Sequence, residues 1–361
     1  MPLLNLAIEQ NTCPGKTSWF DCAEKFLIFP DSDLIPLSDI DIAKSIKKKL
    51  KHKGIESLFP LQYKIYDYIQ NDSQDKYFKR ARDICICSPT GCGKTFCYVL
   101  PILQSYLKSR ATTSIIIAPS IVLCQQIVSV LNIFSRKFDV DIRMSGNHDT
   151  TKDHIIWVLT PLRLKELLYK QQINHMNLKF IIFDEADKLF DQKHGDWQKI
   201  LCEFLENNFK ISTIENWLKC IKPIPQKIFL SATLKDEPEF ISEMNLFQPV
   251  IFLTDKNDNS KPVINSNLKE SFLTCDPIYK SLILAHIVLK YMKEHSKLSI
   301  LCFVNNVNVL KRLSRLLTQH PDIKVSRHCS EMNQNKKNHN LNRFTNGKTN
   351  IMITTDSLSR G

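Results

Sequence analysis

The sequence contains no C-x-x-C pair, although it has 12 cysteines in 361 residues. Structural zinc sites usually hold the metal through such pairs, so their absence argues against a zinc site. Cys85, Cys87 and Cys124 lie in or beside apolar stretches, where free cysteine behaves as a small hydrophobic residue. The pattern favours reduced, buried cysteines in an intracellular protein over a disulfide framework.

The sequence also lacks an apolar run of the roughly 20 residues that a membrane-spanning helix needs. Its first ten residues, MPLLNLAIEQ, carry no basic residue and too short an apolar run for a signal peptide. These two absences predict a soluble protein with no membrane partner.

Acidic residues are in the minority: 37 Asp and Glu stand against 49 Lys and Arg, a net charge of +12. This balance favours polyanionic partners. With 43% hydrophobic residues the chain can build a sizeable core, which argues against wholesale disorder. Six of the ten residues 44–53 are lysines; a solvated helix face and a nuclear-localisation or RNA-contact role both remain open.

Short, continuously apolar runs alternate with longer segments of helical character. Continuous rather than alternating hydrophobicity is typical of strands buried on both faces of a parallel sheet. The alternation predicts a doubly wound α/β fold. The expected strands are 83–88, 114–119, 155–160, 179–184, 227–232, 299–304, 323–328 and 350–355.

Polar residues follow most of these runs, and the carboxyl ends of parallel strands meet at one edge of a sheet, where ligands bind. A stretch rich in Asn, Asp, Ser, Lys and Pro, 253–267, indicates a linker. We therefore expect an N-terminal extension (1–34), a first α/β domain (35–253), a linker (254–265) and a second domain (266–361).

The strongest single motif is TGCGKT, residues 90–95, between a strand and a helical run. Glycines let backbone amides turn toward a phosphate, a following lysine reaches the β- and γ-phosphates, and a Thr hydroxyl holds Mg²⁺. The strict pattern has glycine where this chain has Ser88. The predicted ATP-binding residues of this loop are Ser88, Pro89, Thr90, Gly91, Cys92, Gly93, Lys94 and Thr95.

Asp184 and Glu185 follow the expected strand 179–184. A carboxylate at a strand end can hold Mg²⁺ through water opposite a phosphate loop, and a neighbouring carboxylate can activate the attacking water. We therefore predict Asp184 and Thr95 as metal ligands, and Glu185, Lys94 and Asp184 as catalytic residues.

The order of these motifs resembles that of the DEAD-box RNA helicases, with Asp184-Glu185-Ala186-Asp187 spelling the name. The resemblance implies two RecA-like parallel-sheet domains, ATP and Mg²⁺ as cofactors, RNA as partner, and a monomer. Gln62 matches the adenine-reading glutamine, and Asp187 with Ser231, Ala232 and Thr233 matches the element that couples nucleotide state to RNA. The implied RNA contacts are Pro119, Ser120, Gly146, Thr160, Arg163, Phe303, Gln334, Thr355 and Arg360.

The chain departs from the family pattern at several RNA-contact positions. Ile121 and Val122 replace an Arg–Glu pair, Leu162 replaces a glycine, and Lys337 replaces an arginine that is the better bidentate donor. An ATP- and RNA-binding scaffold without productive hydrolysis is therefore an alternative function. A DNA translocase of the same superfamily is a second alternative.

Ser88-Pro89 and the segment 272–290 resemble the branch of the family that assembles the large ribosomal subunit in the nucleolus. This resemblance implies pre-ribosomal partners and a nuclear, nucleolar location, with the cytoplasm as the alternative. The family pattern continues beyond Arg360-Gly361 to an element that supplies arginines to the γ-phosphate. We therefore expect an incomplete second domain, in which the strand 350–355 keeps one neighbour.

Overall fold

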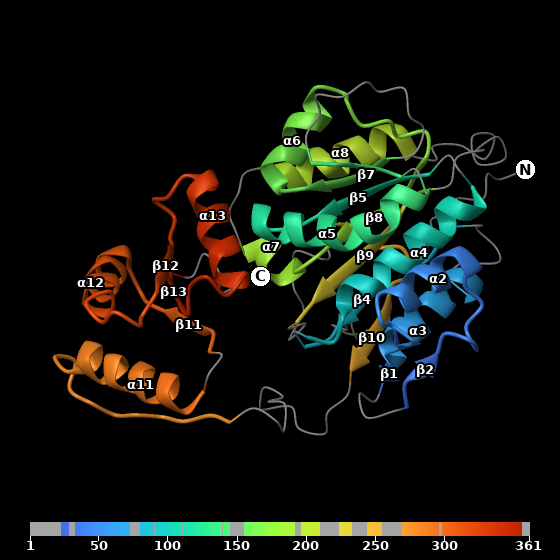
Figure 1. Cartoon of the computed structure of the whole chain (residues 1–361). Coiled ribbons are helices and arrows are strands. Elements are labelled where there is room, and N and C mark those ends of the chain that lie inside the picture. The colour runs from blue at the N-terminus through green and yellow to red at the C-terminus, as the bar shows by residue number, and fades with distance from the viewer. Residues whose placement is uncertain are drawn as a thin grey trace, which may run out of the picture. The chain divides into compact units, whose positions relative to one another are not determined.

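The computed structural model describes residues 23–28, 33–72, 80–89, 91–109, 112–138, 140–144, 155–191, 196–209, 224–232, 244–254, 269–295 and 298–355. The chain forms two compact units, Met1–Val263 and Ile264–Gly361 (Figure 1). The division falls inside the segment 254–265 that the sequence suggests as a linker.

The first unit is built on an eight-stranded sheet in which every pair of neighbours is parallel, in the order β1-β10-β4-β9-β8-β5-β7-β6. A short antiparallel pair, β2 (Ile35–Pro36) and β3 (Ser57–Leu58), stands apart from it. The strands of the large sheet are β1 (Glu24–Ile28), β4 (Ile84–Cys87), β5 (Thr113–Ile117), β6 (Asp141–Arg143), β7 (Ile155–Leu159), β8 (Leu178–Phe183), β9 (Gln226–Ser231) and β10 (Val250–Thr254).

Helices cover both faces of this sheet (Figure 1). Successive strand residues point to opposite faces: Ile182 packs with the cluster of α2–α5, whereas Ile181 and Phe183 pack with that of α6–α8. The helices are α2 (Lys44–His52), α3 (Pro60–Asp67) with the π-helical η1 (Tyr68–Asp72), α4 (Lys94–Lys108), α5 (Ile121–Phe138), α6 (Pro161–Tyr169), α7 (Ala186–Asp191) and α8 (Trp197–Phe209).

The predicted doubly wound α/β fold is confirmed, and each of the eight expected strands is present to within two residues at either end. Five strands are not predicted from the sequence: β1, β6 and β10 of the large sheet, and the short pair β2 and β3. β1 lies inside the segment 1–34 that was set apart as an extension, yet it pairs with β10 along its whole length. β1 is an edge strand whose first four residues are exposed or half-exposed, so it lacks the continuous apolar run of a central strand.

The lysine-rich segment forms α2. Ile46 and Leu50 are fully buried against the core, while Lys48 and Lys51 point to solvent. The geometry is that of an amphipathic surface helix with a solvated basic face. Among the described residues, no helix is long and apolar enough to cross a bilayer.

The second unit has a three-stranded parallel sheet of β11 (Ile300–Phe303), β12 (Val325–His328) and β13 (Ile351–Thr354), in the order β11-β13-β12. Helices α11 (Lys280–Glu294) and α12 (Val307–Leu317) share an apolar core with the strands, and α13 (Gln334–Thr345) packs against β12. The expectation for the last strand is wrong: β13 has two neighbours and is fully buried. The strand that exposes apolar side chains is β11, with Leu301 and Phe303.

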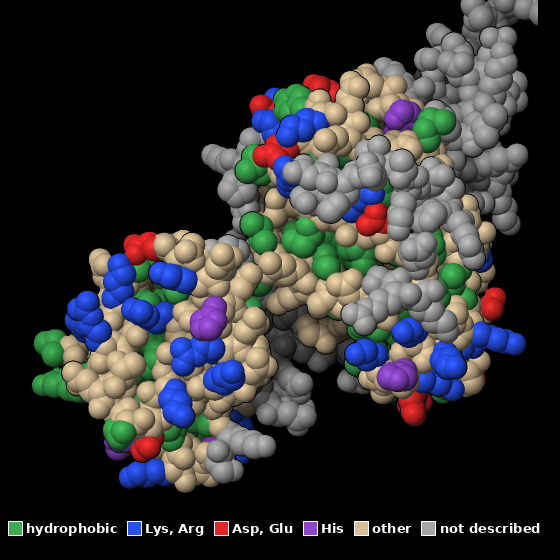
Figure 2. Space-filling model, turned by 45° about the horizontal axis from the view of Figure 1, so that its top comes forward, with side chains coloured by type: hydrophobic (Ala, Val, Ile, Leu, Met, Phe, Trp, Pro, Cys, Tyr) green, Lys and Arg blue, Asp and Glu red, His purple; other side chains and the backbone are tan. Residues whose placement is uncertain are grey.

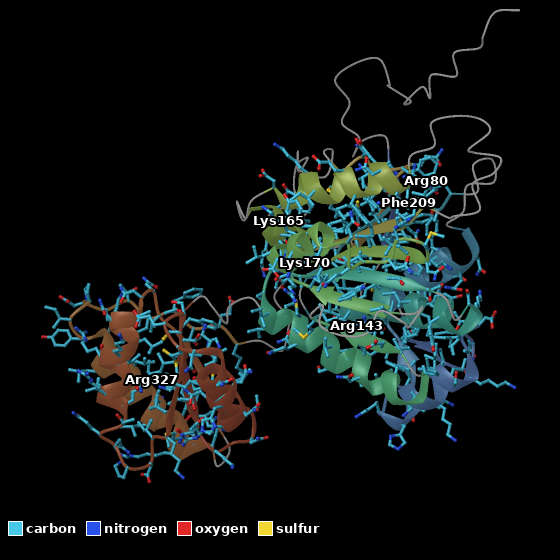
Figure 3. All side chains as sticks on the ribbon, turned by 90° about the horizontal axis from the view of Figure 1, so that it is seen from above. Arg80, Arg143, Lys165, Lys170, Phe209 and Arg327 are labelled. Atoms are coloured by element: carbon cyan, nitrogen blue, oxygen red, sulfur yellow. The ribbon has the colours of Figure 1, made fainter. Side chains whose placement is uncertain are left out.

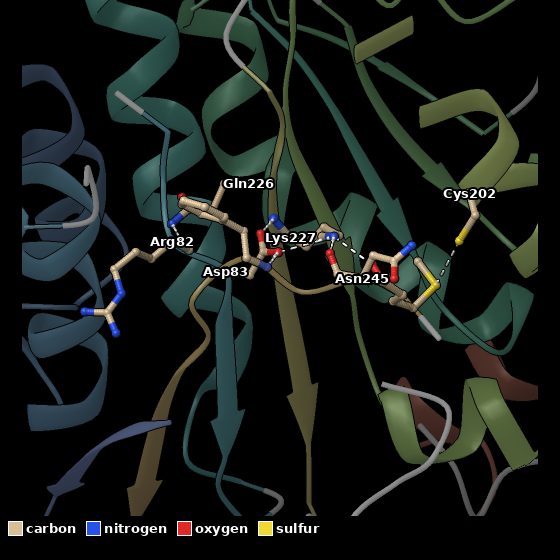
Figure 4. A network of polar contacts seen from close by, with 8 residues as sticks. Arg82, Asp83, Cys202, Gln226, Lys227 and Asn245 are labelled. Carbon is tan, nitrogen blue, oxygen red and sulfur yellow. Dashed lines mark hydrogen bonds and ion pairs between the residues drawn. The ribbon is translucent and has the colours of Figure 1, made fainter. Parts of the chain in front are cut away.

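A buried ion pair ties the strands of the first unit to the segment before β10 (Figure 4). The Lys227 ammonium lies 3.3 Å from Asp83 and donates to the carbonyl oxygens of Met244 and Asn245 at 2.7 Å. The Asp83 carboxylate accepts from the backbone N–H groups of Lys227 and Phe247. A second buried cation, Arg143, donates to Asp141 at 2.7 Å (Figure 3).

Replacing Asp83 by alanine should destabilise the first unit by about 3–5 kcal/mol, because the Lys227 ammonium would stay buried without its counter-ion. Urea denaturation measures this free energy. The matched control is Arg82→Ala, which removes the neighbouring, partly exposed ion pair with Glu24 and should cost about 1 kcal/mol or less. Equal costs for the two variants would contradict the account.

His328 at the end of β12 is buried, and burial followed by the nearby Lys337 charge lowers its pKa. The unfolded chain therefore takes up a proton near pH 6.5 that the folded chain resists, so the stability of the second unit should fall as the pH drops below about 6.5. Thermal unfolding between pH 8 and 5.5 should show a smaller loss for His328→Asn. The exposed His339→Asn should keep the wild-type profile; if it flattens the profile as much, the assignment is wrong.

Candidate nucleotide site

The strand order brings three sequence-predicted segments together at one edge of the large sheet. β9 lies between β4 and β8, so the residues that follow these parallel strands end at the same edge. The Ser88 amide donates to the Ser231 carbonyl at 3.1 Å, and the Asp184 amide donates to the carbonyl of Ile117 at the end of β5. The predicted phosphate loop (88–95), the acidic turn that begins at Asp184 and the segment that begins at Ser231 are therefore neighbours in space.

The loop after β4 has the backbone shape that an anion site requires. Gly91 and Gly93 have φ values of 87° and 68°, in the left-handed region that glycine adopts freely. Gly93 caps α4, so the first amides of that helix face the loop. Lys94 folds back over the loop, and its ammonium donates to the Ser88 carbonyl at 2.8 Å.

The other predicted loop residues are placed as follows. Pro89 and Cys92 are partly buried, and Cys92 is a free thiol. The Ser88 side chain is buried, and its hydroxyl has no hydrogen-bond partner among the described residues. Thr90 lies outside the described residues.

Gln62 joins α3 to the phosphate loop. Its amide nitrogen donates to the Gly93 carbonyl at 3.0 Å, and its amide oxygen accepts from the Phe59 N–H at 3.0 Å. The side chain is 4% exposed. The predicted adenine-reading residue is thus in direct contact with the loop, which the distance of about 30 residues in the sequence does not reveal.

Gly93→Ala should damage this site more than Gly91→Ala. A Cβ at Gly93 would overlap the Gln62 amide nitrogen, whereas a Cβ at Gly91 meets nothing within 4 Å. Both variants incur left-handed backbone strain of about 1–2 kcal/mol, but only Gly93→Ala also displaces Gln62. Isothermal titration with ATP should show the larger loss of affinity for Gly93→Ala. An equal loss for the two variants would contradict a role of the Gln62–Gly93 contact in ATP binding.

Asp184 is 5% exposed at the end of β8. It accepts hydrogen bonds from the Tyr98 hydroxyl at 2.8 Å and from the Glu185 amide at 3.0 Å. Burial raises the pKa of this carboxyl; the Tyr98 hydrogen bond lowers it, the Glu185 charge raises it and the Lys94 charge lowers it. Lys94, Asp184 and Glu185 therefore lie within electrostatic reach of one another.

Tyr98 is a site residue that the sequence analysis missed. It lies one helical turn after Lys94 on α4, is fully buried, and donates a hydrogen bond to Asp184. Burial is the main cause that raises the pKa of its hydroxyl, so it stays a neutral donor. The signal in the sequence is a polar hydroxyl within the apolar helix segment FCYVL, which typically finds a partner when buried.

Glu185 has a φ of 52°, which is uncommon for a residue with a long side chain and costs about 1–3 kcal/mol. Its carboxylate is partly exposed and pairs with Lys188 at 2.8 Å through Oε2. Glu185 thus follows Asp184 directly at the sheet edge, and its carboxylate is more exposed than that of Asp184. Asp187 is partly buried in the first turn of α7.

Of the first-unit residues predicted to contact RNA, Pro119 and Ser120 follow β5, and Thr160 and Arg163 follow β7, at the same edge. Ser120 accepts from the Leu123 amide at 3.2 Å and so begins α5. Thr160 precedes α6, and Arg163 on α6 pairs with Glu166. The Leu162 side chain is 67% exposed. Gly146 and Thr233 lie outside the described residues, whereas Ala232 is partly buried after β9.

In the second unit, Phe303 ends β11 and is 47% exposed. Thr355 follows β13 and is partly buried, and Gln334 begins α13. The Gln334 side chain and Arg360 lie outside what the structure describes. Within the described residues of both units, no group of three or more His, Cys, Asp or Glu residues could hold a metal ion by itself.

Two family models match the chain. The model described as DEAD/DEAH box helicase matches residues 67–241, and the model described as Helicase conserved C-terminal domain matches residues 280–361. Together they include both the phosphate loop with its acidic partner and the three-stranded sheet of the second unit.

Two curated proteins of known name are similar to this chain in sequence. The human ATP-dependent RNA helicase DDX51 is 26% identical over 380 residues, which cover 91% of this chain and 56% of DDX51. Saccharomyces cerevisiae ATP-dependent RNA helicase DBP6 is 30% identical over 396 residues, covering 96% and 60%. This chain therefore spans less than two thirds of either relative.

The solved structure of the DEAD-box helicase Mss116 bound to ssRNA and UDP-BeF has a TM-score of 0.72 with this chain at 20% identity. The match covers 92% of this chain and 68% of that one. At this identity the likeness shows the fold, and it confirms the expected RecA-like α/β architecture.

Proposed function

Because the chain belongs to the DEAD/DEAH box helicase family, we propose that it is an ATP-dependent RNA helicase or RNP remodeller. It hydrolyses ATP to ADP and phosphate while it locally separates RNA strands. The observation that carries this proposal is the 2.8 Å hydrogen bond that Tyr98, one turn after Lys94 on α4, donates to Asp184, because it brings the helix of the Lys94 loop against the Asp184–Glu185 turn.

The phosphate loop grips the triphosphate of ATP. The amides of Gly91–Gly93 and of the first turn of α4 donate to phosphate oxygens, and the Lys94 ammonium exchanges its bond to Ser88 for the β- and γ-phosphates. Gln62 reads the adenine ring. Its hydrogen bond to Gly93 links the residue that binds the base to the loop that binds the phosphates.

The oxygen donors at this edge fit Mg²⁺, a hard cation that takes oxygen ligands. Thr95 would hold it through its hydroxyl and Asp184 through water, and Tyr98, which lies on the same helix as Thr95 and donates to Asp184, would orient the Asp184 carboxylate toward that helix. When bound, Mg²⁺ offsets negative charge on the phosphates. Glu185 orients the attacking water and accepts its proton on the carboxylate.

Asp187 with Ser231, Ala232 and Thr233 couples nucleotide state to RNA binding. The RNA contacts of both units go to phosphate and sugar, so we expect little sequence preference. The similarity to DDX51 and DBP6, with the family-branch resemblance in the sequence, supports action on pre-ribosomal particles in the nucleolus. We expect the protein to work as a monomer.

Two substitutions separate ATP binding from hydrolysis. Lys94→Ala should abolish detectable binding of a fluorescent ATP analogue. Glu185→Gln should retain binding but lower RNA-stimulated phosphate release by about 10²- to 10⁴-fold, because the general base is lost. Lys170→Ala, an exposed lysine at the end of α6 (Figure 3), should change neither quantity.

Phosphate release should be stimulated by single-stranded RNA and not by DNA of the same sequence. Equal stimulation by both would favour the DNA translocase. ATP binding without any stimulation would favour the non-enzymatic scaffold.

A further inference from the structure

The net charge of the chain is unevenly divided. Residues 269–361 carry 15 Lys and Arg against six Asp and Glu, whereas residues 1–268 carry 34 against 31. The net charges are therefore +9 and +3. Figure 2 shows Lys and Arg side chains gathered over the second unit with few acidic ones among them. The predicted RNA contacts of this unit are Phe303, Gln334, Thr355 and Arg360, of which only Arg360 is charged, so they do not account for this excess.

Part of the excess is organised on α12. Leu310, Leu313 and Leu317 face the core, and the opposite side of the helix is exposed. The helix contains no acidic residue. Its outer side borders a hollow of about 470 Å³ whose lining is Asn308, Lys311, Arg312, Arg315, Leu316 and Gln319.

The partners of these cations leave the arginines available. Lys311 pairs with Glu331 at 2.8 Å and is neutralised locally. Among the residues that the structure describes, Arg312 makes one hydrogen bond, of 3.3 Å, to the uncharged Ser281 hydroxyl. Arg312 and Arg315 are exposed and one turn apart on the helix, and a guanidinium matches the oxygens of a phosphate in a bidentate geometry.

We propose that the outer face of α12, taken from Asn308 to Gln319 just after the end of the helix, binds the RNA phosphate backbone as a contact surface additional to the family motifs. This inference rests on the proposed function. The face extends for about 16 Å along the helix, and it begins five residues after Phe303, a predicted RNA contact at the end of β11. RNA that reaches Phe303 can therefore continue along α12, where Asn308 and Gln319 offer amides to phosphate or sugar oxygens.

The test replaces Arg312 and Arg315 together by glutamine in the 361-residue chain, which removes both charges and preserves helix propensity. Binding of a fluorescein-labelled 20-nucleotide oligouridine is followed by anisotropy between 50 and 300 mM KCl. Each lost phosphate contact lowers the slope of log K against log salt by about 0.7 on a single strand. The variant should therefore lose about 1.4 in slope and on the order of tenfold in affinity near 100 mM salt.

The matched control is Lys48→Gln with Lys51→Gln. These exposed lysines are also one turn apart, on α2 of the first unit, and the control has the same net charge as the test variant. It should keep the wild-type slope. Affinity for a fluorescent ATP analogue and the unfolding temperature should be unchanged in both variants, which shows that the units remain folded.

An unchanged slope in the arginine variant, or an equal loss in the lysine control, would overturn the assignment to α12. Tighter binding of an oligoglutamate peptide than of oligouridine, lost in the arginine variant, would show that the face serves an acidic protein and would also overturn it. A wild-type chain that binds the ATP analogue but no RNA at 50 mM salt would instead refute the proposed function, and this inference with it.

Discussion

Parallel pairing of β4, β9 and β8 is the constraint on which the candidate site depends. Because all three strands run the same way, the loops that follow them meet at one edge, and the Ser88–Ser231 backbone bond holds two of those loops together. The loops do not have the regular backbone geometry of the strands. Gly91 and Gly93 in one loop adopt left-handed conformations, and Glu185 in another has a strained positive φ. The rigid sheet fixes the positions of the loops, and the loops carry the candidate functional side chains.

The site is also where the fold accepts unfavourable electrostatics. Asp184 is a carboxylate in a buried position, and burial disfavours its charged form. Tyr98 and the Glu185 amide compensate in part through hydrogen bonds, and the Lys94 charge does so at longer range. At the opposite ends of β4 and β9, Asp83 and Lys227 form an ion pair, and each also hydrogen-bonds to backbone groups. The charges of the Asp83–Lys227 pair are balanced within the protein. A ligand that brings positive charge would stabilise the buried Asp184 carboxylate further.

The two units differ in the part they play. The first holds the phosphate loop, its acidic partner and almost balanced charge, while the second holds most of the net positive charge on a smaller sheet. A polyanion is therefore attracted mainly to the second unit, at long range and without sequence preference. This division fits the proposed function, in which the first unit binds the nucleotide and the second unit contributes to binding the nucleic acid. The proposed surface on the outer face of α12 adds RNA contacts to those of the motif residues.

The sequence by itself determined the fold class, the eight strands with continuous apolar runs and the identity of the loop and acidic residues, because local patterns of period and residue type encode them. It did not reveal β1, whose residues are half exposed at a sheet edge, nor the central place of β13, which comes last in the chain. Tertiary structure alone decided that Gln62 contacts Gly93 and that Tyr98 hydrogen-bonds to Asp184. Strand order and side-chain contacts of this kind arise from packing between segments distant in sequence, and no local pattern records them.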